Sequence, residues 1–211
     1  MLLTSAYCPP ISWFALAARD FTLSGDRVIP STVVLEASEN YRKQSYRTRC
    51  RIAAAGGVET ISVPIVHAAP KMPILSVKID YSTPWLVRNE RAIDSAYRTS
   101  AWFDYYRDSL YKIMESGQES LFEYNLSLIR YFLQKTGIAC EISLTDNFVK
   151  EADDDFRYAI DPKKPDTVLR DLGIEKPYFQ VFSGKYGFKE NLSIMDLLFN
   201  EGPDSLSFLK G

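Results

Sequence analysis

The spacing of hydrophobic residues changes several times along the chain, and each change predicts a new element of secondary structure. Residues 1–7 form a short apolar run that Pro9 and Pro10 end. From residue 11 to residue 19 the apolar positions recur every three or four residues, as on one face of a helix. The chain is therefore expected to begin with a strand, a turn and a helix. Ligands of open α/β sheets usually lie at the carboxyl end of such a strand, which makes residues 7–13 a candidate site segment.

Further strands are predicted where apolar residues alternate with polar ones or form short continuous runs. These segments are residues 32–36, 47–54, 59–66, 75–79 and 141–144. Gly56 and Gly57 stand between the second and the third segment, and paired glycines tolerate the positive φ angles of a tight hairpin. We therefore expect residues 47–66 to form a β-hairpin.

Helical spacing takes over between residues 83 and 136, where three apolar stripes predict three helices. Their expected start and end signals are Thr83 with Pro84, Ser100, the capping box of Ser116 with Glu119, and Gly137. A last helix is expected between Ser193, a typical cap, and Gly202. The whole pattern predicts the α/β class: a single domain over residues 1–211, with a mixed sheet, a β-hairpin and a group of packed helices.

Basic and tyrosine side chains are concentrated in residues 39–52, which contain five cations and two tyrosines. The alternation predicts that Ser45, Arg47, Arg49 and Arg51 share one strand face, while Tyr46, Thr48, Cys50 and Ile52 share the other. Guanidinium groups suit phosphate or carboxylate, so the basic face is a candidate anion site. Two alternatives are an ordinary solvated strand face and a structural cluster in which the arginines pair with Glu36 and Glu39.

Positions outside the basic face, and two within residues 39–52, are further candidates for chemistry. Asn125 falls in the apolar stripe of the third predicted helix, where an unpaired amide would cost about 1 to 3 kcal/mol. It is expected either to bond to a backbone group or to Asn147, or to point at a ligand. His67 is the only histidine and is either a general base or an ordinary surface histidine. Without His67, a carboxylate such as Glu39 or Asp80, or Lys43, would have to act as the base.

Composition excludes several classes of function. A net charge of −2 argues against a general nucleic-acid binder, which needs an excess of cations. The three cysteines have neither zinc-site nor disulfide spacing, which suits a reducing cytoplasm.

No apolar run approaches the ~20 residues of a membrane span, and the N-terminus lacks the basic region of a secretion signal. Motifs for dinucleotides, P-loops, serine hydrolases and zinc proteases are missing, and Asp153, Asp154 and Asp155 suit a solvated loop better than a metal site. We expect no cofactor and no metal.

A family resemblance adds to this picture. Residues 40–50 followed by residues 61–65 resemble the WbqC-like protein family, a bacterial group associated with O-antigen and polysaccharide gene clusters. Further similar blocks are residues 79–82, 96–98, 103–106, 125–129, 178–182 and 187–203. In the N-terminal loop Tyr7 and Pro9 match a family signature, whereas Leu3 and Thr4 stand where the family has histidine and glutamine. The departure removes the obvious imidazole from this loop.

The resemblance implies a cytoplasmic transferase in cell-surface polysaccharide or O-antigen biosynthesis, and glycine or other aminoacyl transfer to a nucleotide-linked sugar is an activity suggested for relatives. The partner would be a nucleotide sugar or another phosphate-bearing small molecule. Both a monomer and a homo-oligomer are compatible with the sequence. The expected binding residues are Tyr7, Tyr41, Lys43, Ser45, Arg47, Arg49 and Asn125, of which Tyr7, Tyr41, Lys43, Arg47 and Arg49 are expected to converge on one pocket. The catalytic candidates are His67, Asp80 and Glu39. The alternative is a non-catalytic protein that binds a nucleotide sugar or an anionic glycan.

Overall fold

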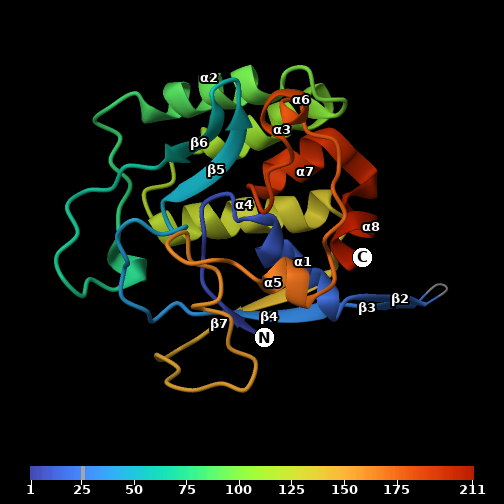
Figure 1. Ribbon diagram of the computed structural model, residues 1–211. Coiled ribbons are helices and arrows are strands. Elements are labelled where there is room, and N and C mark those ends of the chain that lie inside the picture. The colour runs from blue at the N-terminus through green and yellow to red at the C-terminus, as the bar shows by residue number, and fades with distance from the viewer. Residues whose placement is uncertain (25–26) are drawn as a thin grey trace.

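A small parallel sheet organises the protein, which is described by a computed structural model over residues 1–24 and 27–211 (Figure 1). Its strands are β1 (Leu2–Leu3), β4 (Ser31–Leu35) and β7 (Cys140–Leu144), in the order β1-β4-β7 and all parallel. Ser31, Val33 and Leu35 of β4 are buried, so the period-two pattern places one strand face in the core. The strand predictions at residues 1–7, 32–36 and 141–144 are therefore confirmed.

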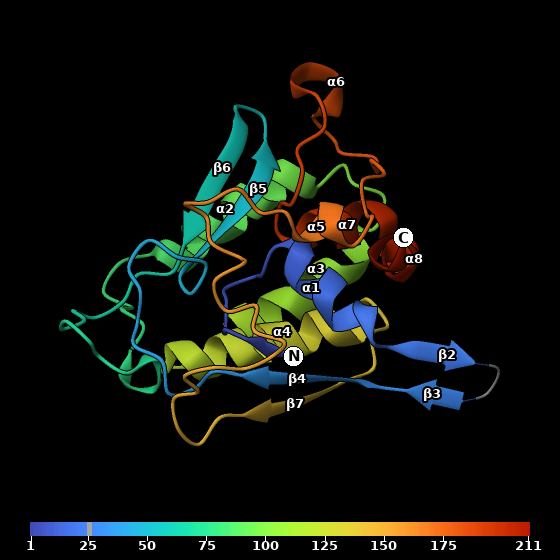
Figure 2. The same ribbon diagram turned by 60° about the horizontal axis from the view of Figure 1, so that its bottom comes forward.

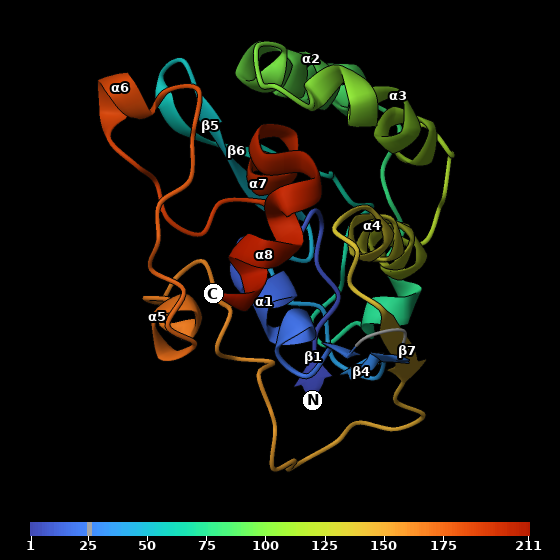
Figure 3. The same ribbon diagram turned by 90° about the vertical axis from the view of Figure 1, so that its right-hand side faces the viewer.

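The helix α1 (Ile11–Arg19) lies at the centre of the molecule. It packs on β4 on one side and on the C-terminal helices on the other (Figure 3). All its residues from Ile11 to Ala18 are buried, because a helix covered on both sides must be apolar around its whole circumference. The predicted strand, turn and helix at the N-terminus match this arrangement.

Two antiparallel ribbons accompany the parallel sheet. β2 (Thr22–Ser24) pairs with β3 (Arg27–Ile29) in a ribbon that projects from the body and was not predicted from the sequence (Figure 2). β5 (Arg49–Ala54) pairs with β6 (Gly57–Ser62) in the predicted hairpin, where Gly57 has a φ of 112°. Only glycine adopts such an angle readily, so the paired glycines do determine the turn.

Three successive helices carry much of the core: α2 (Trp85–Tyr97), α3 (Phe103–Met114) and α4 (Leu121–Lys135). The α/β class with a hairpin and packed helices is thus confirmed.

The predicted caps of these helices need correction. Pro84 precedes α2 without a side-chain cap, and the cap of α4 is Ser120, whose hydroxyl accepts a hydrogen bond of 3.3 Å from the Glu123 N–H. Ser116 lies in the preceding turn, where Gly117 reverses the chain with a φ of 69°.

The strand predicted at residues 75–79 is wrong. The segment contains the short 3₁₀ helix η1 (Ile74–Ser76) and then makes only isolated bridges, from Ile79 to Ile65 and from Lys78 to Ser120. Val77 and Ile79 are nevertheless buried. The alternating apolar residues do mark buried positions. The segment, however, crosses between the hairpin and α4 and is not a strand of a sheet.

The chain ends in five short helical segments: α5 (Val168–Asp171), α6 (Ser183–Tyr186), α7 (Ile194–Glu201), η2 (Gly202–Asp204) and α8 (Ser205–Lys210). The Ser193 hydroxyl caps α7, and Gly202 ends it with a φ of 55°, as predicted. Among the described residues, no helix has both the length and the apolarity that crossing a bilayer requires.

Candidate functional site

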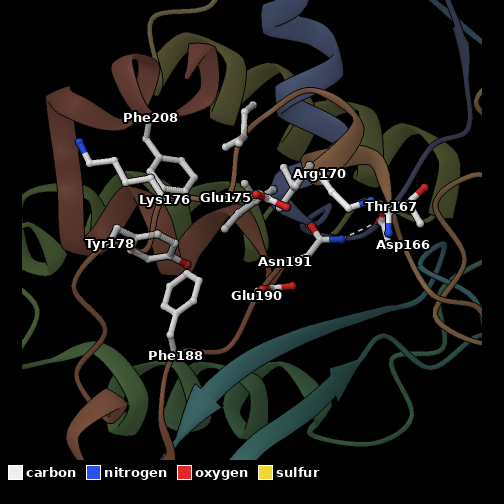
Figure 4. Close-up of a pocket in the computed structure, with 13 residues that line it drawn as sticks. Asp166, Thr167, Arg170, Glu175, Lys176, Tyr178, Phe188, Glu190, Asn191 and Phe208 are labelled. Carbon is white, nitrogen blue, oxygen red and sulfur yellow. Dashed lines mark hydrogen bonds between the residues drawn. The ribbon is translucent and has the colours of Figure 1, made fainter.

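A cavity of about 270 Å³ lies beside the beginning of α1, and its lining comes mainly from residues 166–178 and 188–191 (Figure 4). This volume is close to the lower end of the range for small-molecule sites, roughly 300 Å³. Its apolar lining residues are Ile11, Leu169, Ile174, Tyr178, Phe188 and Phe208. The other lining residues are polar: Asp166, Thr167, Arg170, Glu175, Lys176, Glu190 and Asn191. The cavity therefore combines an aromatic wall with a hydrogen-bonding end.

Asp166 organises the polar end. Its Oδ2 accepts hydrogen bonds of 2.7 Å from the Ser12 hydroxyl and 2.6 Å from the Asn191 amide, and its Oδ1 accepts one of 3.0 Å from the Val168 N–H. The Ser12 N–H donates in turn to Asn191 Oδ1 at 2.9 Å. These bonds connect α1, the start of α5 and the chain before α7, so the carboxylate and the amide are held in a fixed orientation.

Both side chains of the Asp166–Asn191 pair keep bonding capacity for a ligand. They are half-buried and line the cavity, whereas Ser12 is fully buried behind them. A carboxylate has about four acceptor positions and an amide nitrogen two donor hydrogens, so an acceptor and a donor remain. Asn191 has a φ of 51°, a left-handed conformation that asparagine tolerates better than most residues. The pair can therefore bond to adjacent hydroxyl groups of one ligand.

Three aromatic rings form the opposite wall, and the rings pack edge to face. The Tyr178 ring centre lies 5.1 Å from that of Phe188 and 5.0 Å from that of Phe208. Figure 4 shows the three rings gathered at one end, away from Asp166 and Asn191. Apolar faces at this position suit the C–H surface of a sugar ring or another flat group.

A buried carboxyl supports this aromatic wall from inside. Asp196 on α7 is 0% exposed, and its Oδ2 accepts hydrogen bonds of 2.5 Å from the Tyr178 hydroxyl and 2.8 Å from the Gln180 amide. Gln180 also bonds both ways to the backbone of Lys189, next to Phe188 in the chain. Burial raises the pKa of Asp196 to about 6. The network thus connects α7 to the two chain segments that carry Tyr178 and Phe188.

The charges around the cavity nearly cancel. Arg170 and Lys176 are cations, whereas Asp166, Glu175 and Glu190 are carboxylates. A site for a bare polyanion would instead need an excess of cations. The lining therefore fits a neutral, hydroxyl-rich group better than a phosphate alone.

The basic stretch of residues 39–52 approaches the polar end of the cavity through Arg51. The Ser193 N–H donates to the Arg51 carbonyl at 2.8 Å, which places β5 beside the chain that carries Asn191. Burial raises the pKa of the Tyr46 hydroxyl, a hydrogen bond with the Arg51 side chain lowers it, and the nearby Asp166 carboxylate raises it. Tyr46 is buried, as the alternation predicted, and lies near both Arg51 and Asp166.

Arg47 does not share the exposed strand face on which the alternation placed it. It precedes β5 in a turn, is 2% exposed, and directs its Nε and Nη2 at the two oxygens of Glu39, at 3.0 and 2.5 Å. A ligand can reach this guanidinium only if the ion pair separates. Pairing with Glu39 was the structural alternative, and the geometry of Arg47 agrees with it.

Asn125 and Tyr7 are also inside the protein. The Asn125 amide donates to the Arg47 carbonyl at 2.8 Å, so its partner is a backbone group and not Asn147, while Asn125 Oδ1 has no partner among the described residues. Tyr7 stacks on Tyr124 with ring centres 6.1 Å apart and accepts a 3.2 Å hydrogen bond from Asn89. Burial raises the pKa of the Tyr7 hydroxyl well above its ordinary value.

The other predicted site residues lie apart from the cavity lining. Ser45 is buried and donates to the Arg42 carbonyl at 2.7 Å, Tyr41 is half-buried, and Lys43, Arg49 and His67 are exposed. Asp80 accepts a 2.8 Å hydrogen bond from the Ser82 N–H, and contacts with Ser82 lower its pKa. Burial raises the pKa of Glu39, and this effect is larger than the opposite effect of the nearby Arg47, which lowers the pKa. The binding and catalytic roles assigned to these residues stay predictions.

The carboxyl edge of the parallel sheet is closed by ion pairs. Glu36, at the end of β4, is fully buried and accepts hydrogen bonds from Arg157 Nη1 at 2.8 Å and the Thr145 hydroxyl at 2.6 Å. Arg157 also pairs with Asp155, and Asp154 pairs with Arg19 at 2.7 Å, so two residues of the acidic loop bind arginines. Over the residues that the structure describes, no group of three or more histidine, cysteine or acidic side chains is arranged to hold a metal ion.

The segment of residues 7–13 does supply part of the cavity, through Ile11 and the support from Ser12, as its place after β1 predicted.

Sequence reasoning missed Asp166, Tyr178 and Asp196 as site residues. Asp166 follows Pro165 in a long polar stretch that carries no motif. Asn191 precedes an apolar helix whose residues all have a packing explanation, so no local pattern marks it as a site residue.

Comparison with known proteins gives one result. The model of the WbqC-like protein family matches residues 6–167, most of the chain, whereas no curated protein and no solved structure matches. The match includes Ser12 and Asp166 of the cavity. It stops before the blocks at residues 178–182 and 187–203, which were also expected to resemble the family. The chain belongs to the WbqC-like protein family.

Proposed function

We propose that this protein is a cytoplasmic transferase of cell-surface polysaccharide or O-antigen biosynthesis, and that the 270 Å³ cavity binds the sugar of a nucleotide-linked substrate. One observation carries the proposal: the oriented Asp166–Asn191 pair faces an aromatic wall across a cavity of this size. A sugar ring presents hydroxyl groups at its edge and C–H groups on its faces, and the two ends of the cavity complement these surfaces. Membership of the WbqC-like family supports the pathway.

The proposed reaction is transfer of glycine or another aminoacyl group to a sugar hydroxyl. The hydroxyl oxygen forms a bond to the acyl carbon of an activated aminoacyl ester, the bond to the leaving oxygen breaks, and the hydroxyl proton passes through a base to that oxygen. Asp166 supplies a carboxylate in the cavity for this proton, and Ser12, Val168 and Asn191 hold it in place. Positioning of the hydroxyl contributes the rest.

A non-catalytic sugar-binding protein is the second candidate. The cavity lining contains neither histidine nor cysteine, the residues that most often serve as base and nucleophile. A turnover assay with nucleotide sugars and an activated aminoacyl donor separates the two candidates, since both predict binding and only the transferase predicts product.

Asp166→Ala is expected to weaken sugar binding about tenfold to a hundredfold, because it removes a charged hydrogen-bond acceptor worth about 1.5 to 3 kcal/mol. Calorimetry with a panel of nucleotide sugars and methyl glycosides measures the affinity. Thermal unfolding of the same samples separates lost affinity from lost folding, since Asp166 also connects three chain segments.

Asp153→Ala is the matched control. Asp153 is an exposed aspartate of the acidic loop and lies outside the cavity lining. Equal affinity for the two variants, or no binding by the wild type anywhere in the panel, would refute the sugar site at Asp166.

A further inference from the structure

A second cavity, of about 650 Å³, adjoins the first. The two share Ile174, Lys176, Tyr178 and Phe208 in their linings. Tyr178 and Phe208 pack edge to face with ring centres 5.0 Å apart, so this ring pair contributes to both cavities. A ligand in the first cavity that extends past Lys176 therefore enters the second.

Lys176 is the cation where the two cavities meet. Its side chain is exposed, and it has no salt bridge to any residue that the structure describes. Figure 4 shows the Lys176 side chain extending past the Phe208 ring, at the aromatic end of the first cavity. An ammonium on a flexible stem binds phosphate as a point charge without a fixed geometry. The position of Lys176 thus suits an anionic linkage between two parts of one ligand.

The second cavity has the features of a site for a flat, hydroxyl-bearing group. Phe179 in its lining is 63% exposed, so its ring is accessible to a ligand. The Phe179 N–H donates to Glu201 Oε1 at 3.3 Å, which places this carboxylate beside the Phe179 backbone. Asp204 adds a second carboxylate. Exposed rings stack on nucleobases, and carboxylates accept hydrogen bonds from ribose hydroxyls.

We infer that the second cavity binds the nucleoside part of a nucleotide-linked sugar, with Phe179 stacked on the base, Glu201 or Asp204 bonded to the ribose, and Lys176 on the diphosphate. The inference rests on the proposed function, since it assumes that the sugar occupies the first cavity. It adds the chemical class of the second half of the ligand, which stays attached to the sugar during the proposed transfer, and the residues that bind this half.

The test uses calorimetry with three kinds of probe on the full chain: nucleoside diphosphates (UDP, GDP, CDP and ADP), the matching nucleotide sugars, and methyl glycosides. Phe179→Ala is expected to weaken binding of diphosphates and nucleotide sugars at least fivefold, because base stacking is worth about 1 to 3 kcal/mol. Lys176→Ala should also weaken them at least threefold and flatten the dependence of affinity on salt. Phe179→Ala should not alter the affinity for methyl glycosides, because Phe179 lies outside the lining of the first cavity.

The control variants are Tyr105→Ala and Lys112→Ala, which remove an exposed ring and an exposed cation from α3. Binding of methyl glycosides without any binding of nucleoside diphosphates would overturn the inference and leave the proposed sugar site intact. Nucleotide binding that is indifferent to both Phe179 and Lys176 would also overturn it. If diphosphates bind and depend on Phe179 but no sugar binds, the nucleoside site stands and the proposed sugar site is wrong.

Discussion

Arg47→Ala is expected to lower the free energy of unfolding by about 3 to 5 kcal/mol, the usual loss when one partner of a buried ion pair is removed. Arg47 is 2% exposed and bidentate with Glu39, whose side chain is 7% exposed. Without the guanidinium, the Glu39 carboxylate would be buried and unpaired. Burial already raises the pKa of Glu39 against the effect of Arg47, and loss of the cation should raise this pKa further. The loss of stability should therefore be larger at pH 8 than at pH 5, where Glu39 can take up a proton.

Urea denaturation at the two pH values measures this effect. Arg107→Ala is the matched control, because Arg107 pairs with Asp94 at 3.0 Å on the surface, with side chains 39% and 37% exposed. An exposed pair is worth about 0 to 1 kcal/mol, so this control should change stability little.

The same Arg47 variant decides between the structural role and the predicted anion site. If Arg47 only holds the fold, the folded fraction of Arg47→Ala should bind nucleotide sugars as the wild type does. A tenfold to hundredfold loss of affinity with a small loss of stability would instead show that Arg47 binds the ligand, at about 1.5 to 3 kcal/mol for a charged hydrogen bond.

Asp196→Asn should change the pH dependence of stability by about 3 kcal/mol between pH 4 and pH 7. Burial raises the pKa of Asp196 from an ordinary 3.8 to about 6, so between these values the folded protein holds a proton that the unfolded chain has lost. Stability conferred by this proton is present below pH 3.8 and is lost as pH rises through 6. The asparagine variant cannot titrate at this position and should not show the loss.

The measurement is the difference in free energy of unfolding between Asp196→Asn and the wild type at several pH values. This difference should shift in favour of the variant as pH rises from 4 to 7, whatever its starting value. Asp204→Asn, which changes an exposed aspartate close in sequence, is the control for the substitution itself. A flat difference for Asp196→Asn would mean that its carboxyl titrates normally despite its burial.

Asp196 also connects stability to the candidate site, because its Oδ2 holds the Tyr178 hydroxyl and the Gln180 amide. Deprotonation leaves Oδ2 a better acceptor for both donors. The aromatic wall should therefore be held more firmly above pH 6, while the protein as a whole gains less from folding. Hydrogen exchange at the amide of Lys189, which bonds to Gln180 Oε1, can follow this local effect separately from global unfolding.

Local pattern alone determined most of the elements. Apolar spacing predicted α1, the three helices between residues 83 and 136, and the strands β4 and β7, because burial of one face imposes a period on the sequence. Gly57 and Gly202 were recognisable because their positive φ angles exclude most other residues. Motif blocks also identified the family, since the match to residues 6–167 includes the basic stretch.

Tertiary structure decided which polar residues meet. Alternation placed Arg47 on a solvated strand face, but the chain turns before β5 and the side chain finds Glu39 in the core. Ser12 meets Asp166 and Asn191 across sequence separations of 154 and 179 residues, and no local pattern encodes that contact. The spacing of apolar residues along the sequence indicates only which face of a helix or strand is buried. The identity of a buried partner depends on how distant segments cross. Here that crossing built the candidate site beside α1, where the basic strand comes close through Arg51 but contributes no residue to the cavity lining.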